Sequence, residues 1–328
     1  MTPPNIFLPF LSSQLIYRLT VVALITVSAL TLISLVGHHA YLELATHFRL
    51  QYALVSTCCI LLLINVQSWK LLPVAVCCAF LNSLFILPYY SRDFKPVSYS
   101  DATHLRLMQA NVQGSNRNYS ALINSITAAH PDIVVLQEVT DEWWNQIKVL
   151  NSDYPFSKAV PKPGGSGMAI LSRYPLANVD VLSLDQSTHL ALLARVDVEG
   201  TTVSLLCLHP PTPVRTDKFQ NRNQQFARAA ALIRATSGVR IIIGDLNTTM
   251  WSPYFADLVR ESGLRDARKG FGLNSTWPMP LPPFLQIPID HCLVSDDVVV
   301  DGVTTGKRTG SDHRPLLVQL QFRKAVPA

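Results

Sequence analysis

Polar side chains directly follow apolar stretches in the C-terminal part of this sequence, and their types suit a hydrolytic site. The clearest case is the stretch Arg240 to Asn247, Arg-Ile-Ile-Ile-Gly-Asp-Leu-Asn. Its β-branched apolar residues predict a strand buried on both faces, and the glycine permits a sharp turn at the strand end. Asp245 and Asn247 are two residues apart, so they point the same way if the chain stays extended. An Asx-type turn is the alternative.

Further polar groups stand at or beside other expected strand ends: Asn111, Glu138, His209, Asp290 and the pair Asp312-His313. Thr140-Asp141-Glu142 can supply the polar first turn of the helix that follows Glu138. Glu138 is therefore free to be a metal ligand. Pro210 and Pro211 hold His209 in an extended loop, which we expect to face solvent.

These groups favour one class of chemistry. Carboxylates and carboxamides form an oxygen-rich site that suits Mg²⁺ or Mn²⁺. The six cysteines lie in apolar stretches without the spacing of a zinc site. Because Mg²⁺ accepts phosphate oxygens as further ligands, the predicted reaction is attack on phosphorus, with the cation neutralising charge as the leaving oxygen departs.

Alternating strands and helices are expected to position the polar groups. Besides the stretch before Asp245, the expected strands are Leu105 to Ala110, Ile133 to Leu136, Met168 to Leu171, Leu190 to Val198, Thr202 to Leu208, Ile289 to Val294 and Leu316 to Phe322. The expected helices are Tyr119 to Ala129, Phe219 to Ala235 and Tyr254 to Ser262. Glu199-Gly200 predicts a tight hairpin turn.

The loop from Trp277 to Leu285 is rich in proline and carries apolar side chains, so it cannot form regular structure. Two interpretations remain open. Its side chains either pack against the helices of the protein itself, or enter a membrane interface or line an acyl pocket.

The N-terminal part of the chain has a different character. Three apolar stretches, at about 19–37, 50–69 and 71–90, are each long enough to cross a bilayer as a helix and contain no ionisable residue. We interpret residues 1–95 as a membrane anchor, with a cleaved signal peptide as the alternative for the first stretch. Residues 96–103 are expected to form a linker, and residues 324–328 a tail.

Charge is unevenly distributed between these parts. Of 27 basic and 22 acidic residues, five and two lie in the first 100 positions, so the remainder carries 22 and 20 and is nearly neutral. A nearly neutral domain lacks the large basic surface that extensive contact with a nucleic-acid backbone needs. The cations flanking the apolar stretches are too evenly placed for the positive-inside rule to determine an orientation.

Taken in order, six motifs resemble those of the endonuclease/exonuclease/phosphatase superfamily. They are Asn111, Gln137-Glu138, His209, Gly244-Asp245-Leu246-Asn247, Ile289-Asp290-His291 and Ser311-Asp312-His313-Arg314-Pro315. The resemblance covers residues 104–323 and implies an α/β fold, the four-layer α/β sandwich of DNase I-like proteins, here preceded by an all-α transmembrane segment of about three helices. Nucleases, sphingomyelinases and inositol-polyphosphate phosphatases share this fold.

The resemblance also implies catalytic roles. Asp245 would orient or deprotonate the attacking water, and Asn247 would fix that water and the phosphate. His313, oriented by Asp290, would contact a phosphoryl oxygen or help to activate the water. His209 would stabilise the transition state or assist the leaving group.

For the metal, the resemblance implies that Glu138 holds Mg²⁺ or Mn²⁺, with Asn111 and Asp312 as nearby ligands or organising groups. His291 faces the other side of its strand and is expected to be structural.

The expected function is therefore that of a membrane-anchored, metal-dependent hydrolase that cleaves a phosphodiester, nuclease-like. The alternatives are a phospholipid or sphingolipid phosphodiesterase or phosphatase acting at the membrane, and a non-catalytic membrane binding protein. The expected partners are a nucleic acid or phospholipid substrate and the membrane itself. The expected location is a bacterial inner membrane, as a multi-pass protein with the catalytic domain outside the cytoplasm.

Overall fold

The structure is a computed structural model that describes residues 12–91 and 102–323. It divides into two compact units, one of Met1–Pro88 with Trp251–Pro253 and one of Tyr89–Met250 with Tyr254–Ala328. Residues 96–101 of the expected linker and the expected tail at 324–328 lie outside the described residues. Ala102 and Thr103, also expected in the linker, already belong to the first strand.

The first unit is helical. Its elements are α1 (Ser13–Ile33), α2 (Ala40–Glu43), η1 (Leu44–Phe48), α3 (Arg49–Asn65), η2 (Trp69–Leu71) and α4 (Leu72–Ile86), and η3 (Leu87–Tyr89) follows. Among the described residues, three helical stretches are long and apolar enough to cross a membrane: Ser13–Ile33, Ala40–Asn65 and Trp69–Tyr89. Many of their large apolar side chains are exposed, Val22, Ile25 and Leu61 among them. Such a surface is unfavourable in water and suits contact with lipid.

The second of these stretches begins earlier than the sequence pattern indicates. It starts at Ala40 and therefore includes Glu43, His47 and Arg49, all of which are buried. The Arg49 guanidinium donates to Asn82 Oδ1 at 3.3 Å. A charged residue lowers the hydropathy of a sequence segment, so the segment is not recognised as part of a span. In a folded helical bundle, polar partners can stabilise the same charge. The expectation of spans without ionisable residues therefore does not hold for this longer helical stretch.

The second unit contains two six-stranded sheets. The first has the order β11-β12-β1-β2-β4-β3, with β1 (Ala102–Asn111), β2 (Ile133–Gln137), β3 (Phe156–Val160), β4 (Met168–Ser172), β11 (Val298–Thr305) and β12 (Leu316–Arg323). The second has the order β5-β6-β7-β8-β10-β9, with β5 (Leu176–Leu182), β6 (Ala191–Val198), β7 (Thr201–Leu208), β8 (Val239–Asp245), β9 (Arg265–Asp266) and β10 (Asp290–Val294).

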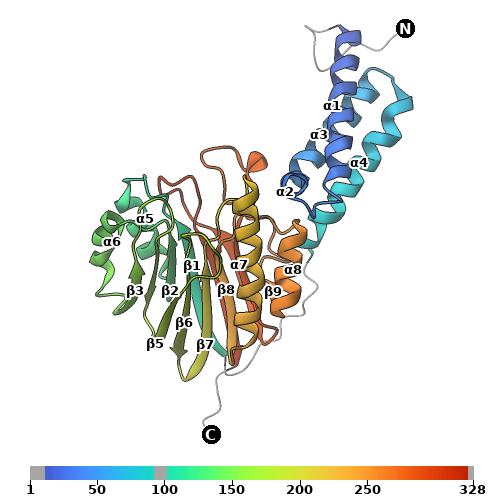
Figure 1. Ribbon diagram of the computed structural model, residues 1–328. Helices are drawn as coiled ribbons and strands as arrows, with labels where there is room; N and C mark the ends of the chain where they lie inside the picture. The colour runs from blue at the N-terminus through green and yellow to red at the C-terminus, as the bar shows by residue number, and fades with distance from the viewer. Residues whose placement is uncertain (1–11, 92–101, 324–328) are drawn as a thin grey trace. The chain divides into compact units, whose positions relative to one another are not determined.

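The two sheets pack face to face between helices, which confirms the four-layer α/β sandwich (Figure 1). One apolar core lies between the sheets and includes Leu107, Val135, Leu205 and Ile243. A second core joins the outer face of the first sheet to α5 (Tyr119–Ala129) and α6 (Asp141–Ile147). Helices α7 (Thr216–Arg234) and α8 (Pro253–Ser262) cover the outer face of the second sheet.

The sequence pattern identifies every central strand of both sheets, and it misses the four edge strands β3, β5, β9 and β11. It also misses α6, of which only the polar first turn was expected. The predicted hairpin turn is present, because Val198 pairs with Thr201 and both residues between them, Glu199 and Gly200, have positive φ.

Candidate active site

The polar side chains that follow the strands lie close together, where corresponding ends of the two sheets are next to each other. Strands β1 and β2 run parallel, as do β7 and β8, so the groups at their carboxyl ends lie at a common edge of each sheet. Strand β10 is antiparallel to β8, and its first residue, Asp290, is paired with Asp245. The residues placed here are Asn111, Glu138, His209, Asp245, Asp290 and His313.

One atom, Asp245 Oδ2, is the centre of this arrangement. Asn111 Nδ2 donates to it at 3.0 Å. His209 Nε2 and His313 Nε2 each lie 3.6 Å from it. Because Asn111 and His313 belong to the first sheet and its connections, and His209 to the second, this buried carboxylate is where the two halves of the sandwich meet.

The close approach of β7 and β8 depends on Gly244. A Cβ at this position would lie 1.9 Å from the carbonyl oxygen of Leu208, so a larger residue would push the two strands apart. Gly244 precedes Asp245 and Leu208 precedes His209. The glycine that the sequence suggested as a turn residue therefore also allows the imidazole and the carboxylate to come together.

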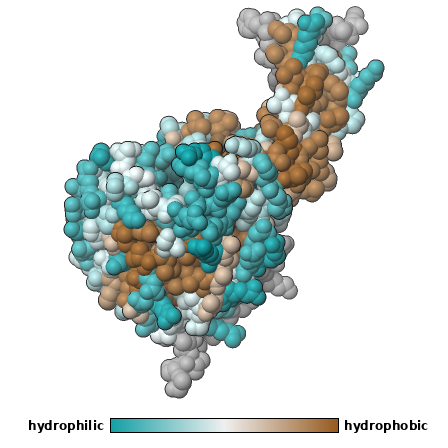
Figure 2. Space-filling model, viewed as in Figure 1, coloured by the Kyte–Doolittle hydropathy of each residue, from teal (hydrophilic) through white to brown (hydrophobic). Residues whose placement is uncertain are grey.

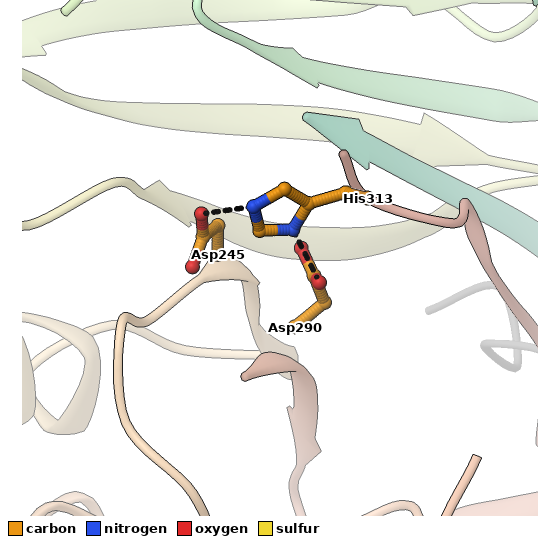
Figure 3. Close-up of side chains that lie close together, drawn as sticks. All are labelled: Asp245, Asp290 and His313. Carbon is orange, nitrogen blue, oxygen red and sulfur yellow. Dashed lines mark hydrogen bonds and ion pairs between the residues drawn. The ribbon is translucent and has the colours of Figure 1, made fainter. Parts of the chain in front are cut away.

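His313 lies between two carboxylates (Figure 3). Its Nδ1 is 2.9 Å from Asp290 Oδ2, and its Nε2 faces Asp245. Burial disfavours a charged imidazole, but attraction to Asp290 and then to Asp245 outweighs it and raises the pKa of His313 to about 10. The structure thus places Asp290 against His313, and the orienting role of Asp290 stays a prediction.

The pKa values of the two carboxyl groups are shifted in opposite directions. Burial raises the pKa of Asp245. Burial also opposes ionisation of Asp290, but His313 outweighs it and lowers the pKa of that carboxyl group. Gln109 supports the ionised form, since its Nε2 donates to Asp290 Oδ1 at 2.7 Å. The site therefore holds an Asp290–His313 ion pair beside a carboxylate that binds a proton more readily.

Glu138 occupies the strained backbone position that follows β2, with a φ of 60°. Its carboxylate accepts from Asn111 Nδ2 at 3.0 Å and from the backbone N–H of Gly114 at 3.1 Å. Thr140 caps the next helix, and Asp141 stands in its first turn, as expected. The role of Glu138 as a metal ligand stays a prediction.

A cavity of about 560 Å³ opens beside these groups. Its lining is mainly polar and comprises Gly114, Ser115, Glu138, Thr140, Pro163, Gly164, Gly165, His189, His209, Thr212 and Lys218. The lining thus includes the carboxylate of Glu138, the imidazole of His209 and the positive charge of Lys218. Such a lining suits an anionic, hydrated substrate group rather than an acyl chain.

Two details differ from expectation. The extended geometry does not continue past Asp245, because Asn247 has a φ of 49° and its N–H donates to Asp245 Oδ1 at 2.9 Å. The Asx-type turn is therefore the correct alternative, and the Asn247 side chain binds the carbonyl oxygen of Pro210 at 3.0 Å instead. His209 is buried rather than solvent-facing, and it packs edge to face against His189, with ring centroids 5.5 Å apart.

Asp312 has partners of its own. Its Oδ2 accepts from Trp277 Nε1 at 3.1 Å, and its backbone N–H donates to Gln113 Oε1 at 3.2 Å. Among the contacts between described residues, none joins it to Glu138. The structure thus places this expected metal ligand next to the proline-rich loop.

His291 faces α8 and lies against Phe255, which agrees with a structural role.

The sequence analysis assigned no role to several supporting residues. Gln109 lies two residues before Asn111 on β1 and so shares its face, a signal that was available. Ser311 joins two motifs, since its Oγ donates to the carbonyl oxygen of Asn111 at 2.8 Å and accepts from the His313 N–H at 3.0 Å. His189 lies in an irregular segment, where no pattern marks it.

Two sets of residues could hold a cation. Asp245, Asp290 and His313 offer ligand atoms within 4.8 Å of one another, but they already pair among themselves. Glu138 lines the cavity and offers its carboxylate oxygens there, with Asn111 Nδ2 as a hydrogen-bond partner. This oxygen-rich donor set fits Mg²⁺ or Mn²⁺ better than a softer metal.

Comparison with solved structures supports the fold. The chain is 18% identical to a humanized D. rerio TDP2 (TM-score 0.57), covering 66% of this chain and 99% of that one. It is 18% identical to an endonuclease/exonuclease/phosphatase from Bacteroides vulgatus (TM-score 0.57; 67% and 100% covered). It is 20% identical to the human Nocturnin catalytic domain (TM-score 0.55; 72% and 99% covered). At these identities the similarity establishes the fold alone.

Comparison of the sequence gives the family. No curated protein matches the chain. The model of the Endonuclease/Exonuclease/phosphatase family matches residues 108–313, which contain five of the six motifs whole and the sixth as far as His313, and which extend over more than half of the sequence. The chain therefore belongs to the endonuclease/exonuclease/phosphatase family.

Proposed function

We propose that this protein is a membrane-anchored phosphodiesterase that hydrolyses its substrate by attack of water on phosphorus. The observation that carries the proposal is the convergence of Asn111, His209 and His313 on Asp245 Oδ2. A buried carboxylate among such donors, beside a polar cavity, can hold a water molecule and receive its proton. Family membership supports a hydrolase acting on phosphate esters.

Each residue would contribute a distinct step. Asp245 orients the attacking water and accepts its proton, which its raised pKa favours. His313 remains charged because of Asp290, and its Nε2 can donate to a phosphoryl oxygen as negative charge develops. His209 stabilises charge from the opposite side of Asp245 or assists the leaving group.

Asn247 and the metal ligands would complete the site. The Asx turn holds Asn247 next to Asp245, and its side chain would fix the water and the phosphate by exchanging its bond to the Pro210 carbonyl oxygen. Glu138 would hold Mg²⁺ or Mn²⁺ together with Asn111, and Asp312 would act as a nearby ligand or organising group. When bound, the cation would neutralise charge on the phosphoryl and leaving oxygens.

The substrate proposed first is a nucleic-acid phosphodiester. D. rerio TDP2, which shares the fold, has been crystallised with a single-strand DNA product. A phospholipid or sphingolipid is the second candidate, and it is favoured by the three apolar helices and by exposed apolar side chains near Asp312. We further propose that the helices anchor the protein in a bacterial inner membrane, with the catalytic unit outside the cytoplasm.

A parallel hydrolysis assay tests this function. The full chain, solubilised in detergent, is offered plasmid DNA and mixed phospholipid vesicles with Mg²⁺ or Mn²⁺, and again with a chelator. Metal-dependent nicking of the DNA supports the first candidate, and metal-dependent release of lipid headgroups supports the second. Hydrolysis of neither, with bis-p-nitrophenyl phosphate also left intact, would contradict the enzyme proposal. A reporter fused to the C-terminus tests the orientation.

A further inference from the structure

The loop after Thr276 is held firmly against the active-site motif. Met279 N–H donates to the carbonyl oxygen of Asp312 at 2.8 Å, and Trp277 Nε1 donates to the Asp312 carboxylate at 3.1 Å. Trp277 and Ile287 form an isolated β-bridge at the base of the loop. A single helical turn, η5 (Pro283–Leu285), forms near its tip and is orange-red in Figure 1. The loop is therefore an ordered projection whose base contacts the residue before His313.

The tip of this projection is apolar and exposed. Leu281, Phe284 and Leu285 are 42%, 54% and 44% exposed. Figure 2 shows an apolar patch at the upper rim of the second unit, where the orange-red loop of Figure 1 lies. Large apolar side chains held in water by a rigid, proline-rich loop are unfavourable, which indicates a surface that is covered in use. Packing against the protein's own helices does not account for the exposure of Leu281 and Leu285.

A pair of basic residues reaches the loop through Arg308. Lys307 and Arg308 are exposed and consecutive, in the connection between β11 and β12. The Arg308 guanidinium lies 3.5 Å from the carbonyl oxygen of Pro280, so one cation contacts the loop itself. Apolar side chains flanked by Lys and Arg are the combination that binds the interface of a bilayer containing anionic lipids.

We propose that Leu281, Phe284 and Leu285 insert into the lipid–water interface of a bilayer, while Lys307 and Arg308 contact anionic headgroups. The inference rests on the membrane anchoring in the proposed function. Three helices of the same chain are long and apolar enough to span a bilayer, so a lipid surface is present at high effective concentration. These helices, together with the basic pair, favour lipid over a second protein as the occupant.

The inference also bears on the substrate. Because the loop is bonded to Asp312 through both its backbone and Trp277, insertion of the tip would hold the Asp312-His313 turn near the headgroup layer. A phosphate ester carried by a lipid would then meet the site without leaving the membrane surface. The polar cavity lining suits the headgroup phosphate, and the acyl chains would stay in the bilayer.

Photocrosslinking tests the contact without requiring activity. The full chain is reconstituted into vesicles that contain anionic phospholipid, with the photoreactive residue p-benzoylphenylalanine in place of Leu281. The matched control carries it in place of Val181, which has the same 42% exposure on the edge strand β5. We expect lipid adducts, identified by mass spectrometry, at position 281 and not at position 181. Adducts at neither position, equal adducts at both, or adducts at 281 only to protein would overturn the proposal.

A second measurement separates membrane contact from catalysis. The double variant Leu281→Ser with Leu285→Ser is expected to hydrolyse bis-p-nitrophenyl phosphate as fast as the unaltered chain. Its hydrolysis of a fluorogenic phospholipid in vesicles is expected to fall about 10- to 100-fold, because burial of leucine at the interface is lost. Equal rates on vesicles would contradict the inferred contact. Failure of both proteins on the soluble ester, with lipid adducts at position 281, would contradict the proposed hydrolase and leave the contact standing.

Discussion

The substitution Asp290→Asn removes the charge that holds His313 in its protonated form. The buried carboxylate lies 2.9 Å from His313 Nδ1 and accepts from Gln109 Nε2 at 2.7 Å. Asparagine has nearly the same shape and keeps an oxygen acceptor, so the packing is retained. The attraction that raises the pKa of His313 to about 10 is largely lost, and burial then favours the neutral imidazole.

The size of the effect follows from the strength of this one interaction. A hydrogen bond to a charged group contributes about 1.5–3 kcal/mol. Since about 1.4 kcal/mol corresponds to a factor of ten in rate, kcat should fall about 10- to 150-fold if the charged imidazole acts in the transition state. The loss of stability should be smaller than the usual cost of breaking a buried ion pair, because Asp290 also repels its cross-strand neighbour Asp245.

The assay is hydrolysis of bis-p-nitrophenyl phosphate at saturating Mg²⁺. The matched control is Asp132→Asn, since Asp132 Oδ2 accepts a backbone N–H from Arg106 at 2.7 Å and lies before the start of β2, outside the site. The control should keep the kcat of the unaltered chain. An unchanged kcat in Asp290→Asn, or an equal loss in both variants, would refute the role given to the ion pair.

Three further substitutions test other parts of the account. Asn111→Ala should raise the Mg²⁺ concentration needed for half-maximal rate, because the amide that links the two site carboxylates is lost; an unchanged Mg²⁺ titration would count against it. Gly244→Ala should lower the melting temperature markedly, since its Cβ would meet the Leu208 carbonyl oxygen at 1.9 Å, whereas Gly302→Ala meets only ordinary contacts and should be tolerated. Burial lowers the pKa of His291 to about 3, below its unfolded value of about 6.5. Below about pH 6.5 the unfolded chain therefore binds a proton that the folded chain does not bind. The contribution of His291 to stability should be constant above about pH 6.5 and should decrease towards pH 3, by up to about 1.4 kcal/mol per pH unit. Melting temperatures at pH 7 and pH 5 should therefore differ less in His291→Phe than in the unaltered chain, and an equal difference would show that His291 does not titrate in this way.

The fold was predictable where burial is complete. Strands such as Ile133–Gln137 and Met168–Ser172 are buried at every residue, so they appear in the sequence as short apolar runs. The edge strand Phe156–Val160 is largely exposed and carries no such run, and Val298–Thr305 is interrupted by a bulge near Gly302. Edge strands depend on a neighbour for their pairing, and the sequence pattern does not show that neighbour.

The candidate site was predictable for a related reason. A polar residue directly after a buried strand is conspicuous, and this signal marked Glu138 and Asp245. It does not mark His189, because no apolar run precedes it closely. The contact between His209 and His189 was also not predictable, since the two residues are 20 positions apart in the sequence. Asp312 lies in the expected motif, but its contact with Trp277 depends on tertiary structure.

Hydrolysis is proposed to take place around Asp245 Oδ2. The most direct test is the rate of Mg²⁺-dependent hydrolysis of bis-p-nitrophenyl phosphate by Asp245→Asn, compared with the unaltered chain at equal melting temperature. The account predicts a loss of at least about 10³-fold, corresponding to about 4 kcal/mol, because the group that orients and deprotonates the water is removed. A loss of less than about tenfold in the folded variant would place the chemistry elsewhere and contradict the account.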